Sequence, residues 1–247
     1  MNAEPAVQLR LLDLQALDVR LDQIAHRRRT LPQIARIADL QTRFASVRDR
    51  VIAAETEVSD LERATAKAES DVEQVRARAR KDQELLDSGR IGSAKELENL
   101  QHEIESLARR QADLEDSELE VMERLEDARG ALAELTRDRD AITAEIEALT
   151  SERDAAWAEA DKDASWIAQE RGAVVGEIPT DLLALYDKLR GDHAGVGAAA
   201  LHQRRCEGCR MELTPTDLGR IRAAAPDEVL RCEECRRILV RTPESGL

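Results

Sequence analysis

The chain has 247 residues, of which 36% are charged and only 2% are aromatic, and its net charge is −14. So few aromatic residues in so charged a chain exclude one large globular core and favour long amphipathic helices. The residues before Asp187 carry a net charge of −15, whereas the remainder carries +1. The acidic part would repel a nucleic-acid backbone, and the C-terminal part would not.

The N-terminal segment gives no sign of export. It lacks a basic start followed by an apolar run, so we expect no signal peptide. No stretch approaches the roughly 18 apolar residues that span a membrane. We therefore expect a cytoplasmic protein without membrane contact, in which thiols stay reduced.

Apolar residues recur at alternating steps of three and four along two long stretches. In residues 37–86, thirteen of the fifteen positions in this pattern are apolar, and in residues 97–149 thirteen of sixteen are. A repeat sustained over so many turns is typical of a coiled coil rather than of a globular helix. We call these two sets of positions the first and second seams.

Two interruptions divide the helical part. Pro32 lacks an amide donor and coincides with a change of phase in the pattern, so it predicts a kink. Gly89 suits the position after a helix end, and Ser93 with Glu96 forms a capping box that starts the next helix. We predict an antiparallel coiled-coil hairpin over residues 1–173, with its turn near residues 88–93. The alternative is that the two helices pair between chains.

A linker over residues 174–197 is expected to follow, with a short helix at 180–190 that Pro179 starts. The apolar face of this helix should pack on the free end of the hairpin, near residues 14–24. We interpret Trp157 and Trp166 as packing residues of the same region.

The last part, residues 198–247, contains all four cysteines of the chain, in two Cys-x-x-Cys pairs. They are Cys206, Cys209, Cys232 and Cys235. Two such pairs can close a tetrahedral shell around one metal ion, so we predict one structural Zn²⁺ in a small β zinc ribbon. Iron, an iron–sulfur centre and a redox dithiol remain alternatives.

The ribbon's other elements follow from its turn residues. Thr214 and Pro215 predict a short helix to about residue 224, and residues 210–213 and 238–242 should be strands. The segment is too small and polar to fold by hydrophobic burial alone. Structural zinc would supply about 10–16 kcal/mol.

Arginines crowd the cysteines, and two interpretations of them stay open. They could contact phosphates or an acidic partner. They could instead compensate the charge of about −2 that a divalent ion with four thiolates carries. Interleaved acids and the absence of aromatic residues after Tyr186 weaken nucleic-acid binding. The candidate nucleic-acid or partner-binding residues are Arg204, Arg205, Arg210, Arg236 and Arg237.

No catalytic constellation is present. The four histidines are scattered, and the many carboxylates lie on faces of the helices that we expect to be solvated. A zinc ion with four thiolates keeps no open position for water or substrate. We therefore expect a protein that is not an enzyme.

The chain resembles a bacterial family of C4-type zinc-ribbon proteins with an N-terminal coiled-coil hairpin. The resemblance rests on Lys95–Leu107, on Ile178-Pro179 followed by Leu185–Arg190, and on both cysteine segments, Cys206–Leu213 and Cys232–Leu239. It implies a zinc site at the four cysteines. Members are commonly described as candidate nucleic-acid-binding proteins, and some are associated with flagellar regulation or secretion as adaptors or chaperones.

One residue departs from the family pattern. A glycine usually follows the last cysteine, and here Arg236 takes its place. That position often has a positive φ, which a bulky residue tolerates poorly.

Three functions remain, in decreasing order. The first is an adaptor that binds protein partners, as a monomer or weak dimer, and the second is an RNA- or DNA-binding regulator acting through the ribbon arginines. The third is a redox enzyme that uses the cysteine pairs.

Overall fold

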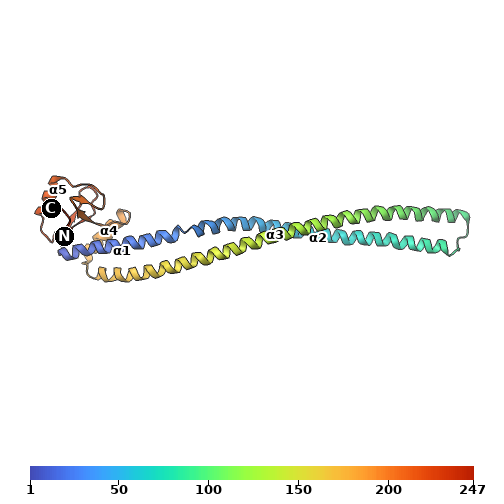
Figure 1. The fold of residues 1–247 in the computed structure, drawn as a ribbon, viewed down its shortest axis with the longest axis horizontal. Helices are drawn as coiled ribbons and strands as arrows, with labels where there is room; N and C mark the ends of the chain where they lie inside the picture. The colour runs from blue at the N-terminus through green and yellow to red at the C-terminus, as the bar shows by residue number, and fades with distance from the viewer. The chain divides into compact units, whose positions relative to one another are not determined.

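The computed structural model describes all residues from 1 to 247, and they form two compact units. One unit consists of residues 36–149, and the other combines residues 1–35 with residues 150–247. Figure 1 shows the elements in chain order, and the helical hairpin with a small C-terminal strand region confirms the predicted fold class. The helices are α1 (Pro5–Arg29), α2 (Pro32–Asp87), α3 (Ala94–Gly176), α4 (Thr180–Asp192) and α5 (Pro215–Ala223). The strands are β1 (Ala198–His202), β2 (Arg205–Cys206), β3 (Leu230–Arg231) and β4 (Ile238–Arg241).

In the unit of residues 36–149, α2 and α3 pair as an antiparallel coiled coil. Every position of the first seam is at least half-buried, and in the second seam only Leu97 is exposed. Ion pairs between the helices flank the seams, such as Arg36 with Glu145 at 2.9 Å and Arg76 with Glu115 at 2.7 Å. The two seams therefore bury each other within one chain, and pairing between chains is not needed to cover them.

The helices are interrupted where the sequence suggests. α1 ends at Arg29 and α2 begins at Pro32, which has no amide hydrogen to continue the helix. In the turn between α2 and α3, Gly89 has a φ of +66°. The Ser93 hydroxyl accepts a hydrogen bond from the Glu96 amide at 3.3 Å and so caps α3. None of the helices combines the length and apolar composition needed to cross a membrane.

The end of α3 lies later than the expected boundary at residue 173. α3 continues through Gly172 to Gly176, and α4 begins at Thr180. The glycine does not end α3 because the neighbouring residues still pack: Val174 and Val175 contact the core that α4 completes. The division into residues 1–173, 174–197 and 198–247 stays a prediction.

The apolar face of α4 packs against α1 and the sheet. Leu182, Tyr186 and Leu189 are buried against Leu11 and Leu14 of α1. The same core contains Ala198 of β1 and Ile238 and Val240 of β4. The expected contact with the hairpin end is thus present, but neither tryptophan belongs to this core.

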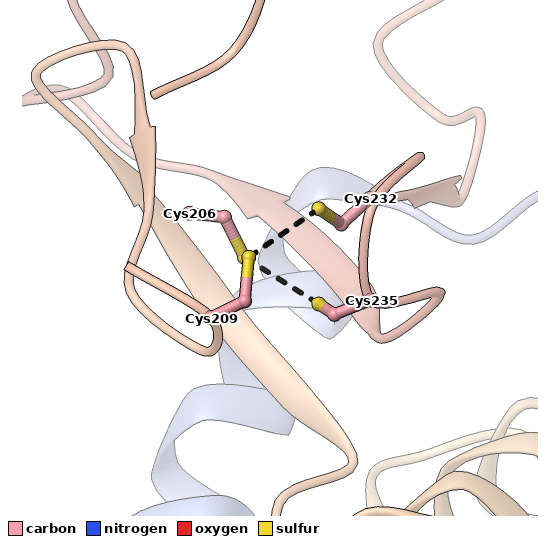
Figure 2. Close-up of side chains that lie close together, drawn as sticks. All are labelled: Cys206, Cys209, Cys232 and Cys235. Atoms are coloured by element: carbon pink, nitrogen blue, oxygen red, sulfur yellow. Dashed lines mark hydrogen bonds between the residues drawn. The ribbon is translucent and has the colours of Figure 1, made fainter. Parts of the chain in front are cut away.

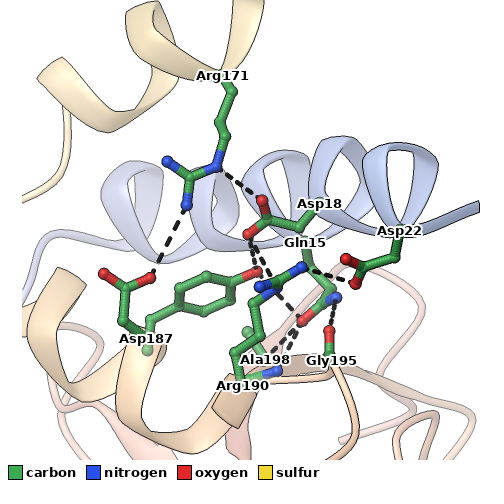
Figure 3. A network of polar contacts seen from close by, with 10 residues as sticks. Gln15, Asp18, Asp22, Arg171, Asp187, Arg190, Gly195 and Ala198 are labelled. Atoms are coloured by element: carbon green, nitrogen blue, oxygen red, sulfur yellow. Dashed lines mark hydrogen bonds and ion pairs between the residues drawn. The ribbon is translucent and has the colours of Figure 1, made fainter. Parts of the chain in front are cut away.

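A buried polar network fixes the same joint (Figure 3). Asp18 of α1 accepts hydrogen bonds from Arg171 of α3 at 2.7 Å and from the Tyr186 hydroxyl at 2.7 Å. It also lies 3.4 Å from the Arg190 guanidinium of α4. Burial, and then the hydrogen bond to Asp18, raises the pKa of Tyr186 far above its usual range, so the phenol stays a donor.

Gln15 connects α1 to the start of the sheet. Its side-chain oxygen accepts hydrogen bonds from the amides of Gly197 at 2.7 Å and Ala198 at 3.3 Å. Its amide nitrogen donates to the Gly195 carbonyl at 2.8 Å. Because Gln15 is buried and fully hydrogen-bonded, it sets the position of β1 relative to α1.

The four-stranded sheet has the order β2-β1-β4-β3. β1 and β4 are parallel, and the two outer pairings are antiparallel. Side chains alternate between faces along a strand. Ile238 and Val240 accordingly join the core with α1 and α4, whereas Leu239 between them joins a second core around the cysteines. The central pair is therefore covered on both faces.

Two strand predictions differ from the structure. Residues 210–213 form no strand, because Cys206 pairs its backbone with Met211 in a tight knuckle and leaves only a bridge between Arg205 and Glu212. The Ala-rich segment before the first cysteine is instead strand β1, since its small side chains fit between two cores. β4 and α5 lie close to their predicted positions.

The first residues pair with the ribbon. The Ala3 amide donates to the Asp227 carbonyl at 2.7 Å, and the Val229 amide donates to the Met1 carbonyl at 3.1 Å. Gln8 of α1 is buried beside this pairing and donates to the Ala3 carbonyl at 2.8 Å. These contacts join parts of the chain more than two hundred residues apart, and no sequence motif announced them.

We expect Asp18→Ala to lower the free energy of unfolding by about 3 kcal/mol, because the substitution leaves Arg171 and Arg190 without their buried partner. Asp13→Ala is the matched control on the same helix. Asp13 pairs with Arg10 in solvent, so its loss should cost less than about 1 kcal/mol. Chemical denaturation of both variants measures the difference, and equal effects would contradict the role given to Asp18.

Candidate metal centre

The four cysteines come from two turns with the same backbone geometry, which we call the first knuckle (206–210) and the second knuckle (232–236). In the first, the Arg210 amide donates to the Cys206 carbonyl at 2.7 Å, and in the second, the Arg236 amide donates to the Cys232 carbonyl at 2.9 Å. Both arginines have a φ of +61°. The expected positive φ at Arg236 is thus present, and the turn forms without glycine.

The knuckles bring the four sulfur atoms together (Figure 2). All four lie within 4.8 Å of one another, and the Cys206–Cys235 and Cys209–Cys232 pairs are each separated by 3.9 Å. Zinc–sulfur bonds of about 2.3 Å place the corners of a tetrahedron about 3.8 Å apart. The donor set therefore fits one structural zinc ion, held by thiolates alone.

The same distances exclude a disulfide in this state. A disulfide needs sulfur atoms about 2 Å apart, and all four cysteines are free. Burial raises the pKa of the Cys206 and Cys232 thiols. Without a metal these two thiols would stay protonated, which makes them poor nucleophiles.

Arg237 holds the first knuckle against the sheet. Its guanidinium donates to the carbonyls of Val196 at 3.0 Å, His193 at 3.2 Å and Gly208 at 3.3 Å. A Cβ on Gly208 would lie 2.9 Å from the Arg237 side chain and 3.0 Å from Ala199, so this position requires glycine. Arg237 is therefore occupied by the fold and is not available to a partner.

Charge compensation also involves Arg237. Burial raises the pKa of Cys235, but hydrogen bonds from the backbone and side chain of Arg237 outweigh it, and the net effect lowers that pKa. A cation beside a sulfur ligand stabilises the thiolate form that zinc requires. For this arginine the compensation interpretation has direct support. Its role as a ligand-binding residue does not.

The other candidate arginines lie at the surface. Arg204, Arg205 and Arg210 are exposed and have no carboxylate within ion-pair distance. Arg236 pairs with Glu233 at 3.3 Å. Arg241, further along β4, donates to the backbone carbonyls that follow α5, including Ala225 at 2.6 Å. Only the three arginines around the first knuckle are thus free to meet a partner.

The ribbon is more apolar than its composition suggests. Around the cysteines lies a core of buried side chains from β1, α5, β3 and β4, and a second core covers the other sheet face. The core around the cysteines contains Ala199, Leu201, Cys206, Leu213, Leu218, Ile221, Leu230, Cys232 and Leu239. Metal binding and apolar packing therefore share the stabilisation, because two ligands are themselves core residues.

Comparison with known proteins defines the class. Residues 14–194 match the model of the CT398-like coiled-coil hairpin domain, and residues 205–239 match the C4-type zinc ribbon domain. The first match covers most of the chain, so the protein belongs to the CT398-like coiled-coil hairpin family with a C4-type zinc ribbon. Neither description names a reaction.

Particular relatives agree over almost the full length. An uncharacterized protein of Mycobacterium tuberculosis is 39% identical over 241 residues, which cover 98% of each chain. A solved structure from Mycobacterium smegmatis is 39% identical, with a TM-score of 0.84 over 98% of this chain and 100% of that one. The structure of CT398 from Chlamydia trachomatis has a TM-score of 0.69 over 96% and 98%, at 18% identity, and so shares the fold.

Metal removal should separate the ribbon from the hairpin. Purified protein is expected to contain one zinc per chain, and a chelator should abolish protection of the ribbon amides from hydrogen exchange. Far-ultraviolet circular dichroism should change little, because the coiled coil has its own buried seams. If the ribbon amides stayed protected without zinc, its two apolar cores would suffice and the structural role of the metal would be wrong.

Arg236→Gly should stabilise the ribbon by about 1 kcal/mol, because glycine adopts a positive φ without strain. The lost pair with Glu233 is exposed and contributes little. Arg205→Gly in β2 is the control, and it should destabilise the ribbon because glycine weakens a strand. Denaturant midpoints of the zinc-loaded variants measure both effects, and the same sign for both would refute the strain at Arg236.

Proposed function

We propose that this protein is a non-enzymatic cytoplasmic adaptor whose zinc ribbon binds an acidic surface of a protein partner. The observation that carries the proposal is the group of three exposed, unpaired arginines around the first knuckle: Arg204, Arg205 and Arg210. They lie on a ribbon joined to α1 and α4 by a shared core. A rigidly held cationic surface needs little ordering when it binds.

The backbone at these arginines supports a role beyond solvation. Arg204 has a φ of +70° and Arg210 a φ of +61°, a region that non-glycine residues avoid. Strained positions persist where the surrounding structure or a function maintains them. Glycine would relieve the strain at both positions, but it would remove the charge.

The metal site supports a structural rather than a catalytic role. Four thiolates fill the coordination shell, so zinc has no position for substrate or water. The coiled-coil seams are buried within one chain, which supports a monomer or weak dimer whose outer helix faces remain free.

Binding of RNA or DNA to the same arginines is the second candidate. The lack of a carboxylate partner favours any polyanion, phosphate chains included. Against it, Glu207 and Glu212 lie among these arginines, and no aromatic side chain is present in the ribbon to stack on a base. We therefore rank a protein partner first.

The test is a crosslinking pull-down with the full-length protein and a variant carrying Arg204→Glu, Arg205→Glu and Arg210→Glu. The wild type should retain a specific partner, and the triple variant should lose it. Arg222→Glu, which alters an exposed arginine of α5 without an ion pair, is the control and should retain it. Retention of the partner by the triple variant would contradict the proposal.

The same samples decide between the two candidates. Affinity for an RNA oligonucleotide is measured at several salt concentrations. Nucleic-acid binding predicts a steep loss of affinity with salt that becomes shallower in the triple variant. The adaptor proposal predicts weak binding in all variants.

A further inference from the structure

Trp166 on α3 is exposed, although aromatic residues make up only 2% of the chain. Its exposed fraction is 54%, and its contact with Arg20 of α1, 5.5 Å from the ring centre, covers only part of it. The other tryptophan, Trp157, is half-buried, and its ring nitrogen donates to the Arg28 carbonyl at 3.2 Å. Packing therefore accounts for Trp157 but leaves Trp166 unexplained.

Trp166 forms one wall of a groove between α1 and α3, which we call the Trp166 groove. Its volume is about 450 Å³, and its apolar surface comes from Ile24 and the buried Ile167. Arg20, Gln23, Arg27 and Asp163 supply its polar surface. A cavity of this size is within the range of binding sites, with room for one or two side chains of a partner.

The groove contains a cation without a partner. α1 ends in the basic run His26-Arg27-Arg28-Arg29. Arg28 pairs with Asp161 at 2.5 Å, but Arg27, which lines the groove, has no carboxylate within ion-pair distance. Arg20 has only a long contact of 3.9 Å to Glu170. Basic residues stabilise the end of a helix, but that interaction does not require an exposed tryptophan beside them.

Tryptophan and arginine are the residues that most often dominate the binding energy of protein interfaces. A nucleic acid fits this place poorly, because Asp161, Asp163 and Glu170 surround it and would repel a continuous chain of phosphates. A short segment with one or two carboxylates and an apolar side chain has both features that the groove complements.

We propose that the Trp166 groove is a docking site for an acidic amphipathic segment of a partner protein. An apolar side chain of that segment contacts Trp166 and Ile24, and its carboxylates pair with Arg27 and Arg20. The site extends the adaptor proposal by adding a second surface, but it does not depend on what the ribbon binds.

The two tryptophans allow a direct test. Trp157→Phe leaves Trp166 as the only tryptophan of the full-length, zinc-loaded protein. It is titrated with three synthetic helical peptides that carry leucine on one face and glutamate, glutamine or lysine on the other. The glutamate peptide should shift the Trp166 emission to shorter wavelength and saturate, with affinities in the order glutamate, glutamine, lysine.

Further variants separate binding from folding. Arg27→Glu in the same background should weaken the glutamate peptide at least about tenfold. Arg110→Glu, at an exposed arginine of α3 in the other unit without an ion pair, should not. Trp166→Ala should abolish binding of a labelled glutamate peptide while leaving the melting temperature within a few degrees of the wild type. A large fall in melting temperature would make Trp166 a structural residue and refute the proposal.

The remaining outcomes each name a different occupant and would overturn the assignment. Equal affinity for the lysine and glutamate peptides would remove the acidic partner. Tighter binding of an RNA oligonucleotide than of the glutamate peptide would indicate nucleic acid. A concentration-dependent shift of Trp166 emission without peptide, with dimers in sedimentation, would assign the groove to a second copy of the chain. The ribbon variant with three glutamates should respond as the wild type does, so failure here and failure of the ribbon proposal are distinguishable.

Discussion

The parallel pairing of β1 with β4 is the constraint on which the ribbon's position and its metal site both depend. One face of this pair closes the core with α1 and α4, and the other closes the core that holds Cys206 and Cys232. Parallel strands usually require cover on both faces, and here helices supply one cover and the zinc knuckles supply the other. A change on either face therefore reaches the metal through a single strand, since Leu239 and Ile238 are neighbours.

Polar groups complete this joint where apolar packing alone would leave its geometry loose. Asp18 lies between two guanidiniums and a phenol, and Gln15 satisfies three backbone groups at the start of β1. Hydrogen bonds have narrower angular requirements than apolar contacts, so they select one orientation of the ribbon on α1. The arginines divide in the same way, because Arg237 and Arg241 serve backbone carbonyls and those around the first knuckle serve none.

Sequence periodicity predicted the coiled coil because each seam position depends mainly on neighbours three and four residues away. The metal site was predictable for a similar reason, since Cys-x-x-Cys already places two ligands on one turn. What could not be predicted comes from contacts distant in sequence. β1 is rich in alanine, which has little strand propensity, and only pairing with β4 makes it a strand. Arg237 resembles its neighbours in sequence, and only its three distant carbonyls identify it as structural.

The pairing of residues 1–3 with residues 227–229 has a consequence for synthesis on the ribosome. The first segment to emerge must wait for almost the last before its backbone groups find their partners. During that interval Leu11 and Leu14 have no α4 or β4 to cover them, although the seams of α2 and α3 can already associate. The nascent chain thus exposes a sticky apolar end that a chaperone would recognise, and zinc can bind only after the danger has nearly passed.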